Sequence, residues 1–316
     1  MKKIVVTDGA TLNPGDLEWT SIMDFGQLDY FDTTPEHLAS IRCASAEIII
    51  TNKTIISREV IRSAPKLKMI AVTATGYNNI DLMAAKEAGV IVCNVPEYGT
   101  YSVAQHTFAL LLEMVNHVSV NAASTTNNGW AASGQWSYTK KRITELKGKT
   151  FGIVGFGRIG QQSAAFAAAF GMNVIFNNRS RKAHAYAKQV ELEDLFSQSD
   201  VVSLHCPLTT DNKEFVDLLL LSKMKPDAML INTSRGPLIN EQDLVSALDQ
   251  GLLARAALDV LSEEPPGRDH PLANHKKCLV TPHTAWISFE ARQRLMKETI
   301  NNIACFLTGK PIHVVG

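Results

Sequence analysis

Three residues in the last third of the chain are of the types that bind a carboxylate and move a proton. Arg235 lies in "INTSRGPLIN", Glu264 in "ALDVLSEEPP" and His283 in "LVTPHTAW". A guanidinium offers a planar fork of donors that matches a carboxylate, and its charge can polarise a neighbouring carbonyl group. An imidazole exchanges protons near neutral pH, and a hydrogen-bonded carboxylate favours its protonated form. These residues form the candidate catalytic group.

Short apolar runs that predict strands precede these residues, and Asn240 is expected to cap a helix after Arg235. Ligands of open α/β sheets bind at the carboxyl ends of the strands, where these residues would lie. Each residue taken alone has another interpretation. Arg235 could pair with Glu263 at the surface, and His283 could be a capping or core histidine. The catalytic interpretation therefore depends on what else the chain binds.

A glycine pattern in "FGIVGFGRIG" predicts a dinucleotide site. Gly155, Gly157 and Gly160 follow a predicted strand and precede an Ala-rich helix that Gly171 is expected to end. In GxGxxG, one glycine makes a tight turn, one lets the backbone approach a pyrophosphate, and one packs the helix against the strand. The alternative is an ordinary tight strand-to-helix turn. With the dinucleotide interpretation, the catalytic interpretation of the downstream residues is favoured.

The residue that contacts the adenine ribose is expected roughly 20 positions after the first glycine. Asn177 and Asn178 occupy this region, followed by the basic run Arg179–Lys182, and no carboxylate is present. A carboxylate would accept the ribose hydroxyls and repel a 2′-phosphate, whereas an arginine can pair with that phosphate. NADP is therefore favoured over NAD. The alternative is a solvated basic loop with NAD bound without the acid. The nicotinamide amide could be bound by Asp259.

Composition limits the class of protein. The 316 residues are 45% hydrophobic and 20% charged, with zero formal net charge. This balance is typical of a globular protein and gives no electrostatic reason to expect nucleic acid or an anionic membrane as a partner. Five scattered cysteines and nine histidines without HExxH spacing argue against disulfides and a metal site. We expect a cytoplasmic protein without a metal.

Two series of apolar runs predict two sheets. "KKIVVTD", "AEIIITN", "LKMIAVTA" and "VIVCNVP" form the first series, and six more runs follow from Thr150. Continuous Val- and Ile-rich runs separated by helical patterns are typical of buried parallel strands. One long helix is expected at Tyr101–Asn127, between the two series. The fold class is therefore α/β, with two doubly wound parallel-sheet domains and an active site expected in the cleft between them.

The chain resembles the D-2-hydroxyacid dehydrogenase family over nearly its whole length. The resemblance is carried, in family order, by "GFGRIG", "LHCPLT", "INTSRGPLIN", "ALDVLSEEP" and "TPHTAW". It implies hydride transfer between a nicotinamide cofactor and C2 of a small D-2-hydroxy or 2-keto acid. It also implies a Rossmann cofactor domain at 99–287, inserted in a discontinuous flavodoxin-like substrate domain at 1–98 and 288–316. A homodimer through the cofactor domain is expected.

The resemblance also implies roles for single residues. Arg235 would bind the substrate carboxylate, His283 would be the acid/base, and Glu264 would be the partner of His283. The backbone around Thr75 and Gly76 would also hold the carboxylate. The residues expected at the cofactor are Val103, Gly155, Gly157, Arg158, Ile159, Gly160, Asn178, Arg179, Ser180, Cys206, Pro207, Asn212, Thr233 and Asp259.

Within the family, "TGYNNID", "SVAQHTFALLLE" and "TPHTAW" resemble the glycerate dehydrogenase or hydroxypyruvate reductase branch. Glycerate/hydroxypyruvate or glyoxylate is therefore the expected substrate. Trp286 either borders the substrate pocket or packs between the domains. One alternative is a formate or phosphonate dehydrogenase of the same fold, and another is a cofactor-sensing, corepressor-like dimer. Formate oxidation needs no general acid, and a binding module needs no complete catalytic group. No regulatory domain is expected after Gly316, which disfavours a long phosphoglycerate dehydrogenase.

Overall fold

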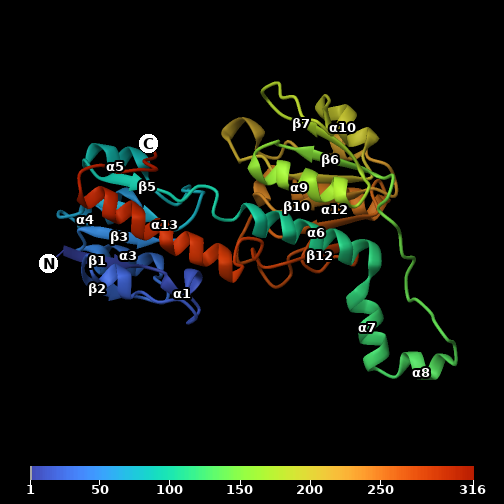
Figure 1. Cartoon of the computed structure of the whole chain (residues 1–316), viewed down its shortest axis with the longest axis horizontal. Helices are drawn as coiled ribbons and strands as arrows, with labels where there is room; N and C mark the ends of the chain where they lie inside the picture. Colours follow the sequence, from blue (N-terminus) through green and yellow to red (C-terminus); the bar gives the residue numbers. More distant parts are fainter. Residues whose placement is uncertain (1) are drawn as a thin grey trace. The chain divides into compact units, whose positions relative to one another are not determined.

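The chain folds into two compact units, each built on one parallel sheet. The structure, a computed structural model, describes residues 2–316. Unit 1 comprises Met1–Gly99 and Ile287–Gly316, and unit 2 comprises Thr100–Trp286 (Figure 1). The chain therefore leaves unit 1 once, completes unit 2, and then returns.

The sheet of unit 1 has the strand order β2-β1-β3-β4-β5, with all described pairings parallel. Every residue of β3 and β4 is buried, which explains their continuous apolar sequences. The strands are β1 (Lys2–Val6), β2 (Gly26–Tyr30), β3 (Ile48–Thr51), β4 (Met69–Val72) and β5 (Ile91–Cys93). This is the doubly wound order of flavodoxin-like domains, as predicted.

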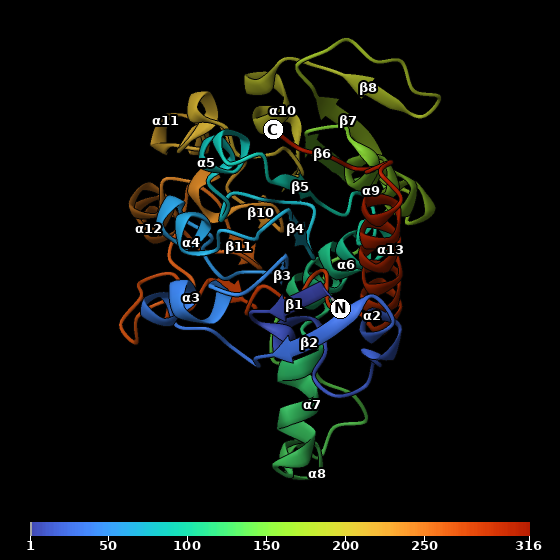
Figure 2. The same cartoon turned by 90° about the vertical axis from the view of Figure 1, so that its left-hand side faces the viewer.

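Helices cover both faces of this sheet. Figure 2 shows α3, α4 and α5 on one side and α2 and α13 on the other. The helices of unit 1 are α1 (Gly9–Leu12), α2 (Thr20–Met23), α3 (Glu36–Cys43), α4 (Arg58–Ser63), α5 (Leu82–Glu87) and α13 (Phe289–Leu307). Because α13 comes from the far end of the sequence, unit 1 is discontinuous.

The C-terminal segment is fastened to unit 1 by specific contacts. Ser288 caps α13 by accepting a hydrogen bond from the backbone N–H of Ala291. The buried guanidinium of Arg292 pairs with Asp16 through two bonds, at 2.5 and 2.6 Å. Beyond the helix, Val314 forms an antiparallel bridge with Cys93 at the edge of the sheet. The segment is thus part of the core structure of unit 1.

The sheet of unit 2 has the order β12-β11-β10-β9-β6-β7-β8, and all described pairings are parallel. The strands are β6 (Thr150–Val154), β7 (Asn173–Asn177), β8 (Ala187–Gln189), β9 (Val201–Leu204), β10 (Met229–Asn232), β11 (Arg255–Leu258) and β12 (Cys278–Val280). From β6 the chain builds outward through β7 and β8, then crosses to β9 on the other side. The loop after β6 therefore opens at the switch point where Rossmann domains bind dinucleotides.

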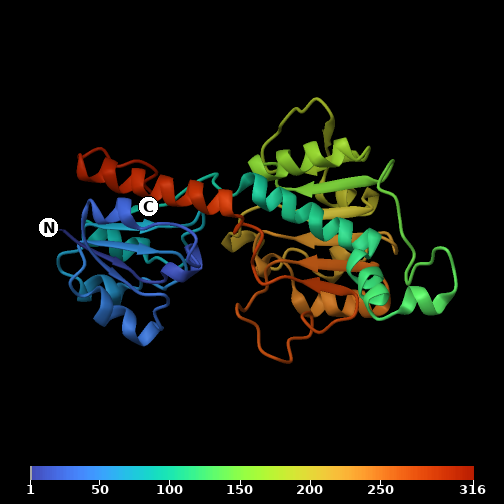
Figure 3. The same ribbon diagram turned by 60° about the horizontal axis from the view of Figure 1, so that its bottom comes forward.

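Two hydrophobic clusters sandwich this sheet. One lies under α6 and α9 and includes Phe108, Phe151 and Ala164, and the other lies under α10, α11 and α12 and includes Phe196 and Leu244. Figure 3 shows α6 and α9 running along the sheet. The helices that pack on this sheet are α6 (Thr100–Asn116), α9 (Arg158–Ala169), α10 (Leu192–Gln198), α11 (Leu218–Leu221) and α12 (Glu241–Gln250). Short 3₁₀ turns occupy η1 (Thr210–Asn212) and η2 (Gly236–Leu238).

The expected single helix at Tyr101–Asn127 was wrong. The structure has α6 and a separate α7 (Val118–Thr126), followed by α8 (Gly129–Ser133). His117 between them has a φ of +52°, and Arg255 donates to the carbonyl of Met114 in the last turn of α6. This left-handed residue breaks the helix, and no residue of α7 or α8 among those described is buried. Figure 1 shows both helices extending away from the sheet of unit 2.

Candidate active site

At the turn from β6 into the next helix, each of the three glycines is favoured for a different structural reason. Gly155 has a φ of +92°, and a Cβ there would lie 2.6 Å from the backbone nitrogen of Cys206. A Cβ on Gly160 would lie 2.3 Å from the carbonyl oxygen of Gly155, so this glycine allows close packing of α9. Around Gly157, by contrast, a Cβ would meet nothing within 4 Å. The loop is tightly packed except where a pyrophosphate would approach, so it fits a dinucleotide.

The helix that follows this loop ends as predicted. Arg158 and Ile159 form the first turn of α9, and Gly171 has a φ of +72° just after it. Gly171 donates to the carbonyl of Ala168, and Met172 donates to that of Ala167. This is the Schellman pattern, in which glycine satisfies the last helical carbonyls.

The segment after β7 folds back onto the glycine loop. The side-chain oxygen of Asn178 accepts from the backbone N–H of Phe156 at 3.0 Å, and its amide donates to Ser180 Oγ at 3.0 Å. The ammonium group of Lys182 donates to the carbonyl of Phe156 at 2.8 Å. Arg179 is exposed. Residues expected at the ribose are therefore directly connected to the loop expected at the pyrophosphate.

The loop after β9 lies next to the glycine loop, at the carboxyl end of the parallel strands. Cys206 touches Gly155, and the amide of Asn212 donates to the carbonyl of Pro207 at 2.8 Å. The side-chain oxygen of Asn212 accepts from the backbone N–H of Thr209 at 2.7 Å. Asn212 thus holds the loop in shape, and its contact with the adenosine half of a cofactor stays a prediction.

Arg235 lies in the loop after β10 and is partly buried. Its backbone is held by Asn232, whose side-chain amide donates to the carbonyl of Arg235 at 2.8 Å. Its guanidinium donates to the carbonyl of Ser234 at 2.7 Å. Among residues 2–316, no ion pair joins Arg235 to Glu263, the surface partner considered from the sequence. Asn240 caps α12 as expected, by accepting from the backbone N–H of Asp243.

Gly236 brings the loop of Arg235 against the loop of Glu264. A Cβ at Gly236 would lie 1.9 Å from the carbonyl carbon of Leu261 and 2.4 Å from the nitrogen of Ser262. Only a residue without a side chain fits there. Sequence reasoning missed this contact, although a glycine directly after Arg235 was a signal for a close backbone approach.

His283 and Glu264 form a hydrogen-bonded pair. His283 Nδ1 lies 2.6 Å from Glu264 Oε2, and the other carboxylate oxygen accepts from the backbone N–H of Leu261 at 3.1 Å. An ionised carboxylate only accepts, so Nδ1 carries the proton of this bond. The opposite nitrogen, Nε2, is then the one that can exchange a proton with a substrate. The side chains retain relative exposures of 22% and 35%.

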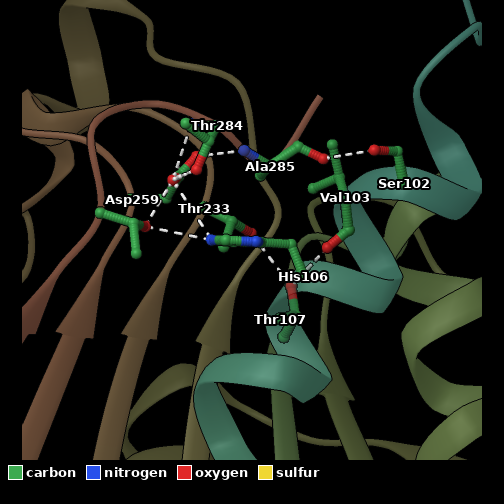
Figure 4. Close-up of polar contacts among 9 residues, drawn as sticks. Ser102, Val103, His106, Thr107, Thr233, Asp259, Thr284 and Ala285 are labelled. Atoms are coloured by element: carbon green, nitrogen blue, oxygen red, sulfur yellow. Dashed lines mark hydrogen bonds and ion pairs between the residues drawn. The ribbon is translucent and has the colours of Figure 1, made fainter. Parts of the chain in front are cut away.

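Asp259 accepts a backbone hydrogen bond from His283 and is 1% exposed. Its carboxylate accepts from Thr281 Oγ1 at 2.6 Å and from the backbone N–H groups of Thr284 and Ala285 at 2.8 Å each, and His106 Nε2 lies 3.3 Å away (Figure 4). Burial acts to raise the pKa of this carboxyl, but the hydrogen bonds together hold it below its ordinary value. The predicted contact of Asp259 with a nicotinamide amide stays a prediction.

The remaining candidates lie in three places. On α6, Val103 is 8% exposed, and Thr107 Oγ1 lies 3.2 Å from Thr233 Oγ1. In unit 1, Thr75 Oγ1 donates to the carbonyl of Val95 at 2.9 Å, and Gly76 follows, partly exposed. Trp286 is the last residue of unit 2 and is buried. The roles of these residues at a cofactor or substrate stay predictions.

No helix within residues 2–316 is both long and apolar enough to cross a membrane. No group of three or more His, Cys, Asp or Glu side chains in the same range could hold a metal ion.

Comparison with known proteins identifies the family. The model for the NAD binding domain of D-isomer specific 2-hydroxyacid dehydrogenases matches residues 108–285, more than half of the chain. The chain belongs to this family. This dehydrogenase therefore has the hydride-transfer chemistry on 2-hydroxy acids, and the nicotinamide cofactor, that its motifs predicted.

Its relatives agree with the predicted branch. This dehydrogenase is 43% identical to a hydroxypyruvate reductase of Blautia hydrogenotrophica over 320 aligned residues and 36% identical to a glycerate dehydrogenase of Methylorubrum extorquens over 317, each alignment covering 99% of both chains. Among solved structures, an acyclic imino acid reductase in complex with NADPH and D-Arg superposes with a TM-score of 0.86 at 35% identity, covering 99% of this chain and 100% of the other. The predicted fold class is thus confirmed.

Proposed function

We propose that this dehydrogenase interconverts a small 2-keto acid and the corresponding D-2-hydroxy acid, with Arg235, Glu264 and His283 as its catalytic group. The observation that carries the proposal is the 2.6 Å contact between His283 Nδ1 and Glu264 Oε2. The close approach at Gly236 keeps the loop of Arg235 beside that of Glu264. An acid/base pair next to a carboxylate-binding arginine is what reduction of a 2-keto acid requires.

Each side chain has a distinct task in the reductive direction. The bound nicotinamide supplies the hydride that adds to C2. The Arg235 guanidinium binds the substrate carboxylate and stabilises the negative charge that develops on the carbonyl oxygen. His283 Nε2 gives its proton to that oxygen, and Glu264 stabilises the imidazolium beforehand. In the oxidative direction, Nε2 takes the proton back.

Hydroxypyruvate and glyoxylate are the substrates we favour. Two relatives that align over 99% of both chains are named for hydroxypyruvate and glycerate. A formate dehydrogenase needs no general acid, and a corepressor-like module needs no catalytic pair. The Glu264–His283 contact therefore disfavours both alternatives.

NADP is the cofactor we favour. The ribose position holds Asn178 instead of a carboxylate, exposed Arg179 follows, and Lys182 bonds to the glycine loop at Phe156. Cationic side chains at this position would attract a 2′-phosphate. The imino acid reductase with 35% identity was solved with NADPH.

A homodimer through unit 2 is the assembly we favour. The segment with α7 and α8 carries exposed aromatic side chains, Trp130 at 49% and Trp136 at 92% exposure. Exposed apolar side chains on an extended segment are typical of a subunit interface. Light scattering should give twice the mass of the chain, and a monomer at micromolar concentration would contradict the dimer.

The five cysteines are all free in the described chain, which supports a cytoplasmic location.

The direct test is a panel of reductions followed at 340 nm. Hydroxypyruvate, glyoxylate, pyruvate and 2-ketoisocaproate are each offered with NADPH and with NADH. We expect oxidation of a cofactor with hydroxypyruvate or glyoxylate, faster with NADPH. If neither cofactor is oxidised with any of the four keto acids, the proposal is wrong.

A further inference from the structure

Three consecutive backbone N–H groups at His283 all donate to Asp259. His283 donates to the carbonyl oxygen of Asp259, Thr284 to Oδ1 and Ala285 to Oδ2, each at 2.8 Å. His283 itself has a φ of +54°, a left-handed conformation that is unfavourable for a residue with a Cβ. Such a conformation persists where surrounding contacts impose it. Asp259 supplies those contacts, so its orientation determines that of the backbone at His283.

The Asp259 carboxylate is in turn fixed by two side chains. Thr281 Oγ1 donates to Oδ1 at 2.6 Å. His106 Nε2 lies 3.0 Å from Thr281 Oγ1 and 3.3 Å from Asp259 Oδ1. Because the hydroxyl proton of Thr281 is directed to the carboxylate, both neighbours of Nε2 are acceptors for it. His106 therefore carries a proton on Nε2 and donates it into this cluster.

His106 lies on α6, and this helix forms hydrogen bonds to loops at the same end of the sheet. On α6, Ser102 Oγ donates to the carbonyl of Ala285 at 2.7 Å, and Thr107 Oγ1 pairs with Thr233 Oγ1 (Figure 4). One face of α6 thus contacts the segments that follow β10 and β12. His106 lies at the centre of this face and reaches the carboxylate that holds His283. Nothing in the predicted site assigned a role to His106.

We propose that His106 is a positioning residue for His283 and acts through Asp259 and Thr281. The proposal rests on the function assigned to His283 above. His106 keeps the Asp259 carboxylate turned toward the N–H groups of Thr284 and Ala285. The backbone then holds the His283 imidazole where it meets both Glu264 and the substrate.

Replacement of the imidazole by an apolar group of similar size tests this role. His106→Leu removes the donor and leaves the buried carboxylate with one contact fewer. We expect kcat to fall about 10- to 100-fold, because a displacement of about 1 Å at a reacting group costs on the order of 100-fold. The KM for the cofactor should change less than kcat does, because α6 and the glycine loop remain folded.

A conservative variant separates positioning from simple packing. In His106→Gln, a side-chain N–H can reach nearly the position of Nε2. We expect kcat within about threefold of the wild type. A matched control is His275→Leu, because His275 Nε2 also pairs with a carboxylate, Asp249 Oδ1 at 3.2 Å, in the same unit but at the end of α12. This control should leave kcat unchanged.

The experiment combines steady-state kinetics with hydrogen–deuterium exchange of a peptide that spans residues 281–287. Exchange should accelerate at least about tenfold in this peptide in His106→Leu, return toward wild type in His106→Gln, and stay unchanged in His275→Leu. Unchanged exchange and kcat in His106→Leu would overturn the proposal, as would acceleration spread over all of unit 2. Exchange needs no substrate. A wild-type protein that reduces no keto acid would therefore refute the proposed function, while the exchange result would still decide the role of His106 in holding the loop.

Discussion

His283 Nδ1 is hydrogen-bonded to Glu264 Oε2 at 2.6 Å, and this contact joins the loops that follow β12 and β11. It fixes the ring orientation and, in the proposed mechanism, leaves Nε2 for the substrate. Both side chains remain partly accessible, as the imidazole must be if it exchanges a proton with a ligand.

Removal of this acid/base pair should lower turnover strongly and leave cofactor binding intact. His283→Ala should lower kcat by about 100- to 10,000-fold, the usual contribution of general acid–base catalysis. Glu264→Gln should also lower kcat, because a neutral amide stabilises an imidazolium less than a carboxylate does. Glu263→Gln is the neighbouring control and should be fully active. Stopped-flow kinetics and cofactor titration measure both properties. A fully active His283→Ala enzyme would rule out the mechanism.

Arg235 should not be replaceable by lysine. Arg235→Lys retains the positive charge but loses the planar fork that binds two carboxylate oxygens. We expect a large rise in KM for the keto acid together with a loss of kcat, while the Kd for NADPH stays the same. A variant with wild-type KM would show that Arg235 does not bind the substrate carboxylate.

Two glycines of the GxGxxG pattern, Gly157 before α9 and Gly160 within it, should respond differently to alanine. Gly157→Ala meets open space, so its unfolding free energy should stay within about 1 kcal/mol of the wild type while cofactor affinity falls. Gly160→Ala places a Cβ 2.3 Å from the carbonyl oxygen of Gly155, and overpacking of this kind costs about 1–3 kcal/mol. Urea unfolding and cofactor titration of both variants compare these effects. Unchanged cofactor affinity in Gly157→Ala would argue against a pyrophosphate at this loop.

Arg179 should discriminate between the two cofactors. If a 2′-phosphate binds at this position, Arg179→Ala weakens NADPH far more than NADH, because the lost contact is specific to that phosphate. Lys188→Ala removes another exposed basic residue of unit 2, in β8, and serves as the control. Fluorescence titration of the wild type and of both variants with each cofactor gives the six dissociation constants. Equal weakening of NADPH and NADH would identify the basic run as a solvated loop.

His205 should make stability depend on pH. Burial lowers the pKa of His205 from its ordinary value of 6.5 to about 4. Between these values the unfolded chain binds a proton that the folded chain does not, so the unfolding free energy decreases as pH falls, by about 1.4 kcal/mol per pH unit. Above pH 6.5 this contribution is constant. Unfolding at pH 7, 6 and 5 should therefore show a shallower pH dependence in His205→Asn than in the wild type. The exposed control, His37→Asn, should retain the wild-type dependence. If the unfolding free energy of His205→Asn depended on pH as that of the wild type does, His205 would not be the source of this dependence.

The sequence predicted the buried strands well because burial on both faces leaves a continuous apolar run, as in Ile48–Thr51 and Met229–Asn232. It missed β2 and β8, because these edge strands, "GQLDY" and "AKQ", contain few apolar residues. The break at His117 was missed because a left-handed residue other than glycine leaves no pattern.

The candidate catalytic residues were recognisable because chemistry dictates their types and the family dictates their order. The contacts that position these catalytic residues could not be recognised in the same way. The contact of Gly236 with Leu261 and the hydrogen bonds of His106 and Thr281 to Asp259 depend on how separate loops meet at one edge of the sheet. Such contacts between distant segments have no local sequence signal.

Transfer of deuterium to hydroxypyruvate from NADPH that carries deuterium in both positions at C4 tests the central claim most directly. Hydride transfer to C2 predicts D-glycerate labelled at C2, detected by mass spectrometry and chiral chromatography. His283→Ala should form this product at least about 100-fold more slowly. Glycerate without the label, or labelled L-glycerate, would contradict the proposed reaction.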